Sequence, residues 1–309
     1  MKKVKLAKKL NGSNIIMGCM RISALEQKEA DVLVNHAYEL GINYFDHADI
    51  YDNGKCESMF GDIIKNNNRF RDKIIIQSKC GIRINSQGRG YYDFSKEHIL
   101  KSVEESLKRL NTDRLDVLLL HRPDTLMNPE EVATAFDILK TSGKVLNFGV
   151  SNQNVSQIKL LKKYVKQPII INQLQASLKH TGIFDSGINV NMTNRESVMH
   201  DDGVVEYARR KNMTIQAWSP FQYGFFEGIF INNEKFPELN NELNIIAEKY
   251  NANASAIATS WLLTHPVSMQ VVIGTTNKER MTDICMGSDI KLTREEWYSL
   301  YTTAGNLIP

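Results

Sequence analysis

The sequence is short of cysteine. Its four cysteines, Cys19, Cys56, Cys80 and Cys285, lie far apart in a chain of 309 residues. They form no CxxC motif, and no histidine lies near them at metal-site spacing, so a disulfide framework and a zinc site are both disfavoured. We therefore expect no bound metal, and thiols that stay reduced, as they do in a cytoplasmic enzyme.

Long apolar runs and a large excess of one charge are also missing. No stretch approaches the roughly 18 apolar residues that a membrane span needs. Lys8, Lys9 and Asn11 interrupt the apolar segment that a signal peptide would require after its basic start. The net charge is only +3, with acidic and basic residues interspersed. We expect neither a membrane nor a nucleic-acid partner, and no pattern indicates an oligomeric state.

The chain does contain eight short apolar runs that alternate with amphipathic stretches. Runs that are apolar almost throughout are typical of parallel strands buried on both faces. Eight repeats favour a closed (β/α)₈ TIM barrel over an open sheet, with residues 1–309 forming one domain. The predicted strands are residues 14–20, 42–48, 73–79, 115–121, 145–151, 169–173, 214–219 and 271–275.

Two segments fall outside this repeat. Residues 4–10 predict a strand of an N-terminal β-hairpin, with Asn11 and Gly12 as its turn, that could plug the barrel. Residues 293–296 form a capping box that opens an extra C-terminal helix running to Tyr301. Helix caps are also expected at Ser95 and Asn128, because such side chains accept hydrogen bonds from free N–H groups.

Two long loops follow the sixth and seventh predicted strands, at residues 181–202 and 220–240. Long loops in a compact domain are usually functional lids or disordered segments. The first loop is either part of the substrate pocket or a mobile surface insertion, and the sequence favours neither. The side chains expected to be available to rim a pocket are Met20, Arg21, Tyr91, Tyr92, Arg122 and Phe225.

Polar residues end several of the predicted strands. Strands two, three and four end near Asp46, Lys79 and His121, and Tyr51 follows strand two. Each has an ordinary explanation by itself: a helix cap, a surface charge or a half-buried histidine. Active sites of this barrel lie at the C-terminal ends of the strands, so the four together indicate a site.

The four side chains suit proton transfer. A nearby ammonium lowers the pKa of a tyrosine from its usual value of about 10, and Lys79 can supply that cation. A buried lysine needs a carboxylate partner, which Asp46 can supply. His121 can donate a hydrogen bond to a substrate oxygen and orient it. We therefore expect Tyr51 to give its proton to a carbonyl oxygen as negative charge develops there.

At this point the sequence resembles the aldo-keto reductases over nearly its whole length. The motifs, in order, are Gly-Ile-Asn-Tyr-Phe-Asp-His-Ala-Asp-Ile-Tyr at 41–51 with Gly54, Glu57 and Gly61, then residues 76–79, 116–124, 148–152, 172–173, 217–220 and 273–276. The resemblance implies that Asp46, Tyr51, Lys79 and His121 are a catalytic tetrad. It also implies reversible reduction of an aldehyde or ketone, with hydride from NADPH and a proton from Tyr51.

No GxGxxG follows the first strand, so a Rossmann cofactor site is not supported. The resemblance instead implies an extended NADPH (NADP⁺) across the barrel mouth. The protein would bind the nicotinamide carboxamide through residues 151, 152 and 173 and stack the nicotinamide ring on residue 218. It would hold the 2′-phosphate near the start of the last barrel helix. The residues implied to bind it are Gly18, Met20, Ser151, Asn152, Gln173, Trp218, Ser219, Phe221, Gly224, Gly274, Thr275, Thr276, Asn277 and Arg280.

Three positions depart from the family pattern. Gly274 stands where a lysine is common, which weakens the expected preference for NADPH. His47 replaces a more usual threonine, and Gln175 replaces a glutamate, so the fine geometry can differ.

Two other functions are compatible with the same residues. The chain could be an NADPH-sensing regulatory subunit with vestigial reductase activity, which multiple-turnover consumption of NADPH would exclude. Alternatively, Lys79 could form a Schiff base in a barrel aldolase. Trapping with borohydride would detect that intermediate, but Tyr51 and residues 275–280 argue against it.

Overall fold

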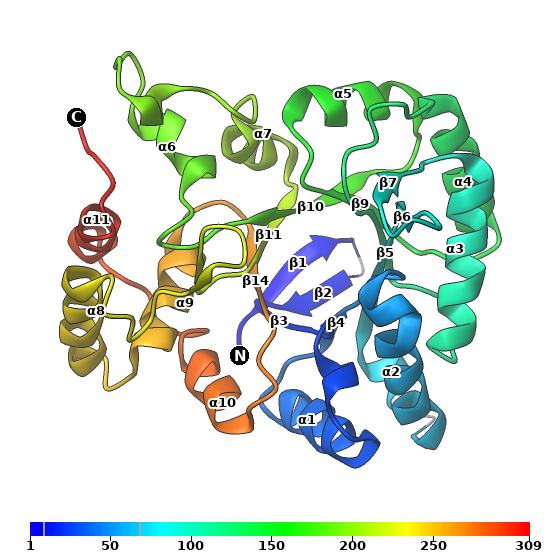
Figure 1. Ribbon diagram of the computed structural model, residues 1–309, viewed down its shortest axis with the longest axis horizontal. Coiled ribbons are helices and arrows are strands. Elements are labelled where there is room, and N and C mark those ends of the chain that lie inside the picture. Colours follow the sequence, from blue (N-terminus) through cyan, green and yellow to red (C-terminus); the bar gives the residue numbers. More distant parts are fainter. Residues whose placement is uncertain (9, 68) are drawn as a thin grey trace.

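Eight parallel strands close into a barrel, which confirms the predicted (β/α)₈ fold. The structure is a computed structural model and describes residues 1–8, 10–67 and 69–309. Figure 1 shows the ring of strands with helices outside it. In chain order the barrel strands are β3 (Ile15–Gly18), β4 (Tyr44–Asp46), β5 (Ile75–Cys80), β8 (Val117–Leu120), β9 (Phe148–Ser151), β10 (Ile169–Gln175), β11 (Thr214–Trp218) and β14 (Met269–Ile273).

The helices begin where the sequence supplies capping side chains. Ser95 accepts a hydrogen bond from His98 N, and Thr293 forms the predicted capping box with Glu296, so both predicted starts are confirmed. Asn128 likewise caps its helix. The helices are α1 (Gln27–Glu39), α2 (Lys55–Asn66), α3 (Lys96–Arg109), α4 (Pro129–Thr141), α5 (Val155–Tyr164), α6 (Gly182–Ile188), α7 (Val204–Lys211), α8 (Pro237–Lys249), α9 (Ala254–Thr264), α10 (Lys278–Met286) and α11 (Arg294–Thr303).

The N-terminal hairpin consists of β1 (Lys3–Ala7) and β2 (Leu10–Ser13) and lies across the ring in Figure 1. Its predicted turn is wrong, because Asn11 and Gly12 lie within β2, where Asn11 pairs with Lys5. The predicted strand 4–10 includes residue 9, which lies outside the described residues. Gly12 is needed for packing: a Cβ there would lie 2.6 Å from the Tyr44 ring, which fills the barrel.

Both long loops contain ordered elements. Residues 181–202 include α6 and a 3₁₀ turn, Arg195–Ser197. Tyr301 on α11 donates a hydrogen bond to Asp185 Oδ1 over 2.8 Å, which ties α6 to the C-terminal helix. The second loop carries the hairpin β12 (Gln222–Tyr223) and β13 (Gly228–Ile229). The sequence did not predict a third hairpin, β6 (Ile82–Ile84) and β7 (Gly90–Tyr92), after β5.

The helices of the described ranges are all too short or too polar to cross a membrane.

Candidate active site

The structure brings the four predicted catalytic side chains together at the C-terminal end of the barrel. Asp46 ends β4, Lys79 lies near the end of the adjacent β5, and His121 follows β8 directly. Lys79 Nζ lies 2.8 Å from Asp46 Oδ2 and 3.0 Å from the Tyr51 hydroxyl. Since parallel strands end at the same edge of the barrel, polar side chains at those ends can meet.

Lys79 remains an ammonium although it is only 1% exposed. Burial alone would lower its pKa, but Asp46 and then Tyr51 act in the opposite direction, and the pKa of Lys79 is raised above its usual value. The backbone carbonyl of His47 accepts a further hydrogen bond from Nζ over 2.8 Å. The buried cation is therefore fixed in position and charge.

The predicted lowering of the Tyr51 pKa is wrong for this structure. Burial raises the pKa of Tyr51, and the opposing effect of Lys79 is smaller. A phenol in so dry a site is disfavoured as an anion, even beside a cation. Tyr51 is consequently protonated near neutral pH.

His121 is held as a neutral imidazole beside Tyr51. The two rings meet edge to face, with centroids 5.9 Å apart. Burial, followed by the charges of Lys79 and Arg122, places the pKa of His121 well below its usual value. A neutral imidazole carries one N–H donor, so His121 can orient a carbonyl oxygen without supplying charge.

His47, one of the departures, has its imidazole buried away from the cavity. It is fully buried, and neither ring nitrogen has a hydrogen-bond partner within the described residues. Its ring packs against Phe60 at 4.6 Å. Burial and the nearby charge of Lys79 lower the pKa of His47 to about 3. The side chain thus acts as a neutral packing group, while its backbone carbonyl binds Lys79.

A cavity of about 1650 Å³ lies over these side chains. That volume exceeds the roughly 300–1,000 Å³ of ordinary small-molecule pockets, so it can hold a dinucleotide and a substrate together. Asp46, Tyr51 and His121 line it, whereas Lys79 lies behind them. The predicted cofactor residues that line it are Gly18, Met20, Ser151, Asn152, Gln173, Trp218, Ser219, Phe221, Gly274, Thr275, Asn277 and Arg280.

The other predicted cofactor residues lie outside the lining of this cavity. Gly224 and Thr276 do not line the cavity. The Gly224 carbonyl accepts a hydrogen bond from Gln175. None of residues 181–202 lines the cavity either, because that segment packs toward the C-terminal helix. Of the two alternatives that the sequence left open for this segment, a contribution to the pocket lining is therefore not found.

Comparison with known proteins identifies the family. The model of the aldo/keto reductase family matches residues 14–302. This chain belongs to the aldo/keto reductase family. It is 33% identical to the uncharacterized oxidoreductase YcsN of Bacillus subtilis, over 98% of this chain and 97% of that protein. It is also 33% identical to a 6-dehydroglucose reductase of Agrobacterium fabrum, over 98% of each chain.

Solved structures agree with this fold. The holo form of the aldo-keto reductase AKR11C1 from Bacillus halodurans superposes with a TM-score of 0.76 at 24% identity, covering 100% of this chain and 98% of that one. The protein described here is accordingly an oxidoreductase of a family that reduces carbonyl groups with nicotinamide cofactors.

One end of the reductase cavity is built around Trp218. Its indole Nε1 donates to Asn152 Oδ1 over 3.1 Å, and Asn152 Nδ2 donates to Ser151 Oγ over 2.8 Å. The Arg122 guanidinium lies 5.5 Å from the Trp218 ring, and Phe226 stacks on it at 6.2 Å. These contacts fix a flat aromatic side chain in the wall of the cavity that Tyr51 also lines, a shape that fits a nicotinamide ring.

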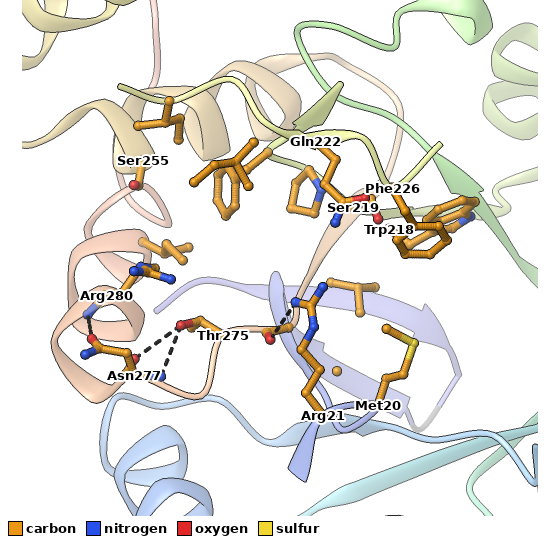
Figure 2. Close-up of a pocket in the computed structure, with 18 of the residues that line it drawn as sticks. Met20, Arg21, Trp218, Ser219, Gln222, Phe226, Ser255, Thr275, Asn277 and Arg280 are labelled. Carbon is orange, nitrogen blue, oxygen red and sulfur yellow. Dashed lines mark hydrogen bonds between the residues drawn. The ribbon is translucent and has the colours of Figure 1, made fainter. Parts of the chain in front are cut away.

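The opposite end of the cavity carries the start of α10. Figure 2 shows Arg280, Asn277 and Thr275 there, far from Trp218 and Phe226. Asn277 Oδ1 accepts from Arg280 N over 2.7 Å, which caps the helix. Arg280 faces the cavity from an exposed position. A guanidinium beside a helix N-terminus fits a phosphate group.

A cation also lies beside Gly274, where the family often has a lysine. Arg21 Nη1 donates to the Gly274 carbonyl over 3.1 Å and lines the cavity, as Figure 2 shows. This arginine comes from the segment after β3 rather than from β14. From the sequence, Arg21 is predicted only as a residue at the rim of a pocket, because no sequence pattern indicates that residues 21 and 274 are in contact.

Other lining residues of the reductase were not predicted at all. Many of them come from the segment between β11 and α8 and from α8 and α9, and they include Phe226, Asn232, Lys235, Glu248, Asn253 and Ser255. No motif marks them, because the packing of the segment after β11 and of α8 and α9 around the barrel brings them to the cavity.

Proposed function

We propose that this protein reduces the carbonyl group of an aldehyde or ketone with NADPH, and that Tyr51 donates the proton to the carbonyl oxygen. The same groups catalyse the reverse oxidation of an alcohol. The contact that carries the proposal is the 3.0 Å hydrogen bond from Lys79 Nζ to the Tyr51 hydroxyl at the floor of a cavity of dinucleotide size.

The chain's own residues divide the work. When bound, the reduced nicotinamide supplies a hydride to the carbonyl carbon. Tyr51 donates its proton to the oxygen, and Lys79 stabilises the phenolate that forms. Asp46 keeps Lys79 charged and oriented over 2.8 Å. His121, as a neutral donor, orients the carbonyl oxygen next to the phenol.

The cavity lining supports a dinucleotide that carries an additional phosphate. Trp218 offers a ring face, while Arg21 and Arg280 place two cations along the wall. Thr275, Asn277 and Arg280 would hold the adenosine 2′-phosphate, which distinguishes NADPH from NADH. Arg21 adds a positive charge near Gly274 that fits the phosphates between the two ends.

A Tyr51→Phe variant tests the proposal. Phenylalanine keeps the ring and its packing but removes the proton, so we expect turnover of small aldehydes to fall by a factor of about 10²–10⁴, the usual contribution of a general acid. The dissociation constant for NADPH, measured by fluorescence, should stay within a factor of about two of the original, because the ring remains in place. Full activity of this variant would refute the role given to Tyr51.

A further inference from the structure

A layer of glutamine amides fills the barrel interior directly beneath Asp46. Strand register pairs Asp46 with Gln77, Gln173 with Gln216, and Gln216 with Gln270. Gln77, Gln216 and Gln270 are fully buried, and Gln173 is 3% exposed. Branched apolar side chains usually fill such interiors. Buried amides are costly unless they are hydrogen-bonded, so this layer needs a specific explanation.

The upper amides of the layer bind the Asp46 carboxylate. Gln77 Nε2 donates to Asp46 Oδ1 over 2.6 Å, and Gln173 Nε2 donates to the same oxygen over 3.2 Å. Both nitrogens also donate to Gln216 Oε1, over 2.9 and 3.0 Å respectively. Tyr44 donates to Gln77 Oε1 over 2.8 Å. The other carboxylate oxygen, Oδ2, is thereby left to Lys79.

The lower amides continue the chain to the backbone. Gln216 Nε2 donates to Gln270 Oε1 over 3.0 Å. Gln270 Nε2 donates to the Ser13 carbonyl over 2.7 Å. Amides thus connect the floor of the barrel, at the N-terminal hairpin, to the carboxylate at its mouth.

The polarity of this chain is fixed at both ends. The carboxylate of Asp46, paired with an ammonium, and the carbonyl of Ser13 can only accept hydrogen bonds. Gln270 must therefore turn its nitrogen to Ser13 and its oxygen to Gln216. Gln216 in turn presents its oxygen to Gln77 and Gln173. If the Gln216 amide alone were reversed, its N–H groups would face the N–H groups of Gln77 and Gln173. Its oxygen would then face the oxygen of Gln270.

The polarity determines what Gln173 offers to the cavity. Its nitrogen is committed to Asp46 and Gln216, so its oxygen is the free end of the amide. Gln173 lines the cavity, and within the described part of the chain its Oε1 has no hydrogen-bond partner. A carbonyl oxygen there is an acceptor for the N–H of a ligand carboxamide.

We propose that Gln216 is a positioning residue of this reductase. It turns the amides of Gln77 and Gln173 so that both donate to Asp46, and it makes Gln173 present an acceptor to the nicotinamide carboxamide. This inference rests on the proposed carbonyl reduction at Tyr51. Gln216 touches neither substrate nor cofactor; it acts through the two amides above it and, through Asp46, on Lys79.

Gln216→Glu is the decisive variant, because its carboxyl group can be switched by pH. A neutral glutamic acid keeps the polarity of the amide: its carbonyl oxygen accepts from Gln77 and Gln173, and its O–H donates to Gln270. An ionised glutamate has no donor for Gln270 and adds a negative charge near Asp46. Burial raises the pKa of such a group above its usual value of about 4.3.

We expect kcat of Gln216→Glu to fall at least about tenfold between pH 4.5 and pH 8, because the lost donor and the added charge disturb the hydrogen bonds to Asp46. The unmodified enzyme should show no such fall. Reduced nicotinamide mononucleotide, which lacks the adenosine 2′-phosphate, isolates the contact with Gln173. Its dissociation constant, from quenching of tryptophan fluorescence, should rise about three- to tenfold over the same pH range, the effect of one lost hydrogen bond.

Asn14→Asp is the matched control. Asn14 is a buried amide that exchanges hydrogen bonds with Ser288 at the other end of the barrel. The same change from amide to acid there should lower the melting temperature, but kcat and the affinity for the mononucleotide should not fall between pH 4.5 and pH 8. Circular dichroism at each pH verifies that Gln216→Glu is folded, and Gln216→Leu, if folded, should show both defects at every pH.

The outcomes separate the two proposals. If Gln216→Glu keeps a flat kcat and an unchanged mononucleotide affinity while Tyr51→Phe is inactive, the role of Gln216 is overturned and the proposed function stands. If the unmodified protein reduces no carbonyl compound, the proposed function fails, and the mononucleotide affinity still decides the role of Gln216. If kcat of Asn14→Asp fell by the same factor between pH 4.5 and pH 8, that role would also be overturned.

Discussion

Arg109, the last residue of α3, donates from Nε to Glu57 Oε2 on α2 over 2.8 Å. Glu57 is fully buried, and Ser78 Oγ donates to its other oxygen over 2.6 Å. The same guanidinium packs under Gly54, where a Cβ would lie 2.6 Å from Arg109 Cδ. Arg109 therefore holds the turn that carries Tyr51, although it lies on a different helix.

That turn is strained and needs such support. Asp52, Asn53 and Gly54 follow Tyr51 directly, with φ of 45°, 52° and 87°. Left-handed residues other than glycine persist only where their surroundings hold them. The turn separates Tyr51 from the start of α2, and the Tyr51 hydroxyl lies 3.0 Å from Lys79 Nζ.

Arg109→Ala should destabilise the fold and also slow catalysis. It leaves the buried carboxylate of Glu57 without its cation, and breaking a buried pair in this way costs about 3–5 kcal/mol. Urea denaturation measures this loss, and kcat should fall because the Tyr51 turn loosens. Arg114→Ala is the control: its partners Asp72 and Asp113 are exposed, so the loss should stay below about 1 kcal/mol. Equal losses in the two variants would contradict the assignment.

The pH dependence should reflect the raised pKa of Tyr51. In the proposed mechanism reduction needs the protonated phenol of Tyr51, and burial raises the pKa of this phenol above the usual value of about 10. We expect kcat/KM for carbonyl reduction to stay level up to pH 9 and to fall only at higher pH. Alcohol oxidation needs the phenolate, so its rate should increase with pH over the same range. A fall in reduction centred near pH 8 would show that Lys79 outweighs burial.

Below neutral pH, the rate of carbonyl reduction should show no change caused by the protonation of a histidine. His121 has a pKa well below the usual 6.5, because burial and the charge of Lys79 disfavour the imidazolium. Reduction should therefore not change between pH 7.5 and pH 6 through this group. Titration of the imidazole signals by nuclear magnetic resonance checks the assignment directly, and an inflection of His121 near pH 6.5 would contradict it.

Arg280→Met should alter cofactor preference. A hydrogen bond to a charged group contributes about 1.5–3 kcal/mol, so NADPH should bind about 10- to 150-fold more weakly. Binding of NADH, which has no 2′-phosphate, should change less than about threefold. Lys278→Met is a suitable control, because Lys278 lies on the same helix but does not line the cavity. A similar loss for both cofactors would place the 2′-phosphate elsewhere.

Gln175→Met should loosen the loop beside Trp218. Gln175 Nε2 donates to the Gly224 carbonyl over 2.9 Å, a bond that a glutamate carboxylate could not make. Losing one neutral hydrogen bond should speed NADPH release about two- to tenfold, as stopped-flow fluorescence would measure. Ser177→Ala, which removes the bond to Gln222 O, should act in the same direction. Gln167→Met, a change near the surface helix α4, should leave the release rate unaltered.

The sequence by itself determined the barrel and the position of its candidate active site. Apolar runs can be recognised because a strand buried on both faces must be apolar along its length. A polar residue that ends such a run must lie at the barrel mouth, so Asp46, Lys79 and His121 could be placed together before any coordinates. Helix caps at Ser95 and Thr293 were predictable for a similar reason, since each acts within four residues of itself.

Only the tertiary structure decided which residues pair through hydrogen bonds and charges, and how the pKa of Tyr51 is shifted. The Tyr51 pKa depends on how much solvent the fold removes as well as on the cation that accompanies it, and burial proved the larger effect. Several contacts join residues that lie far apart in the chain: Arg21 with Gly274, Arg109 with Glu57, and the glutamines beneath Asp46 with one another. Local patterns do not encode such contacts, because they follow from strand register and from how the helices pack around the barrel.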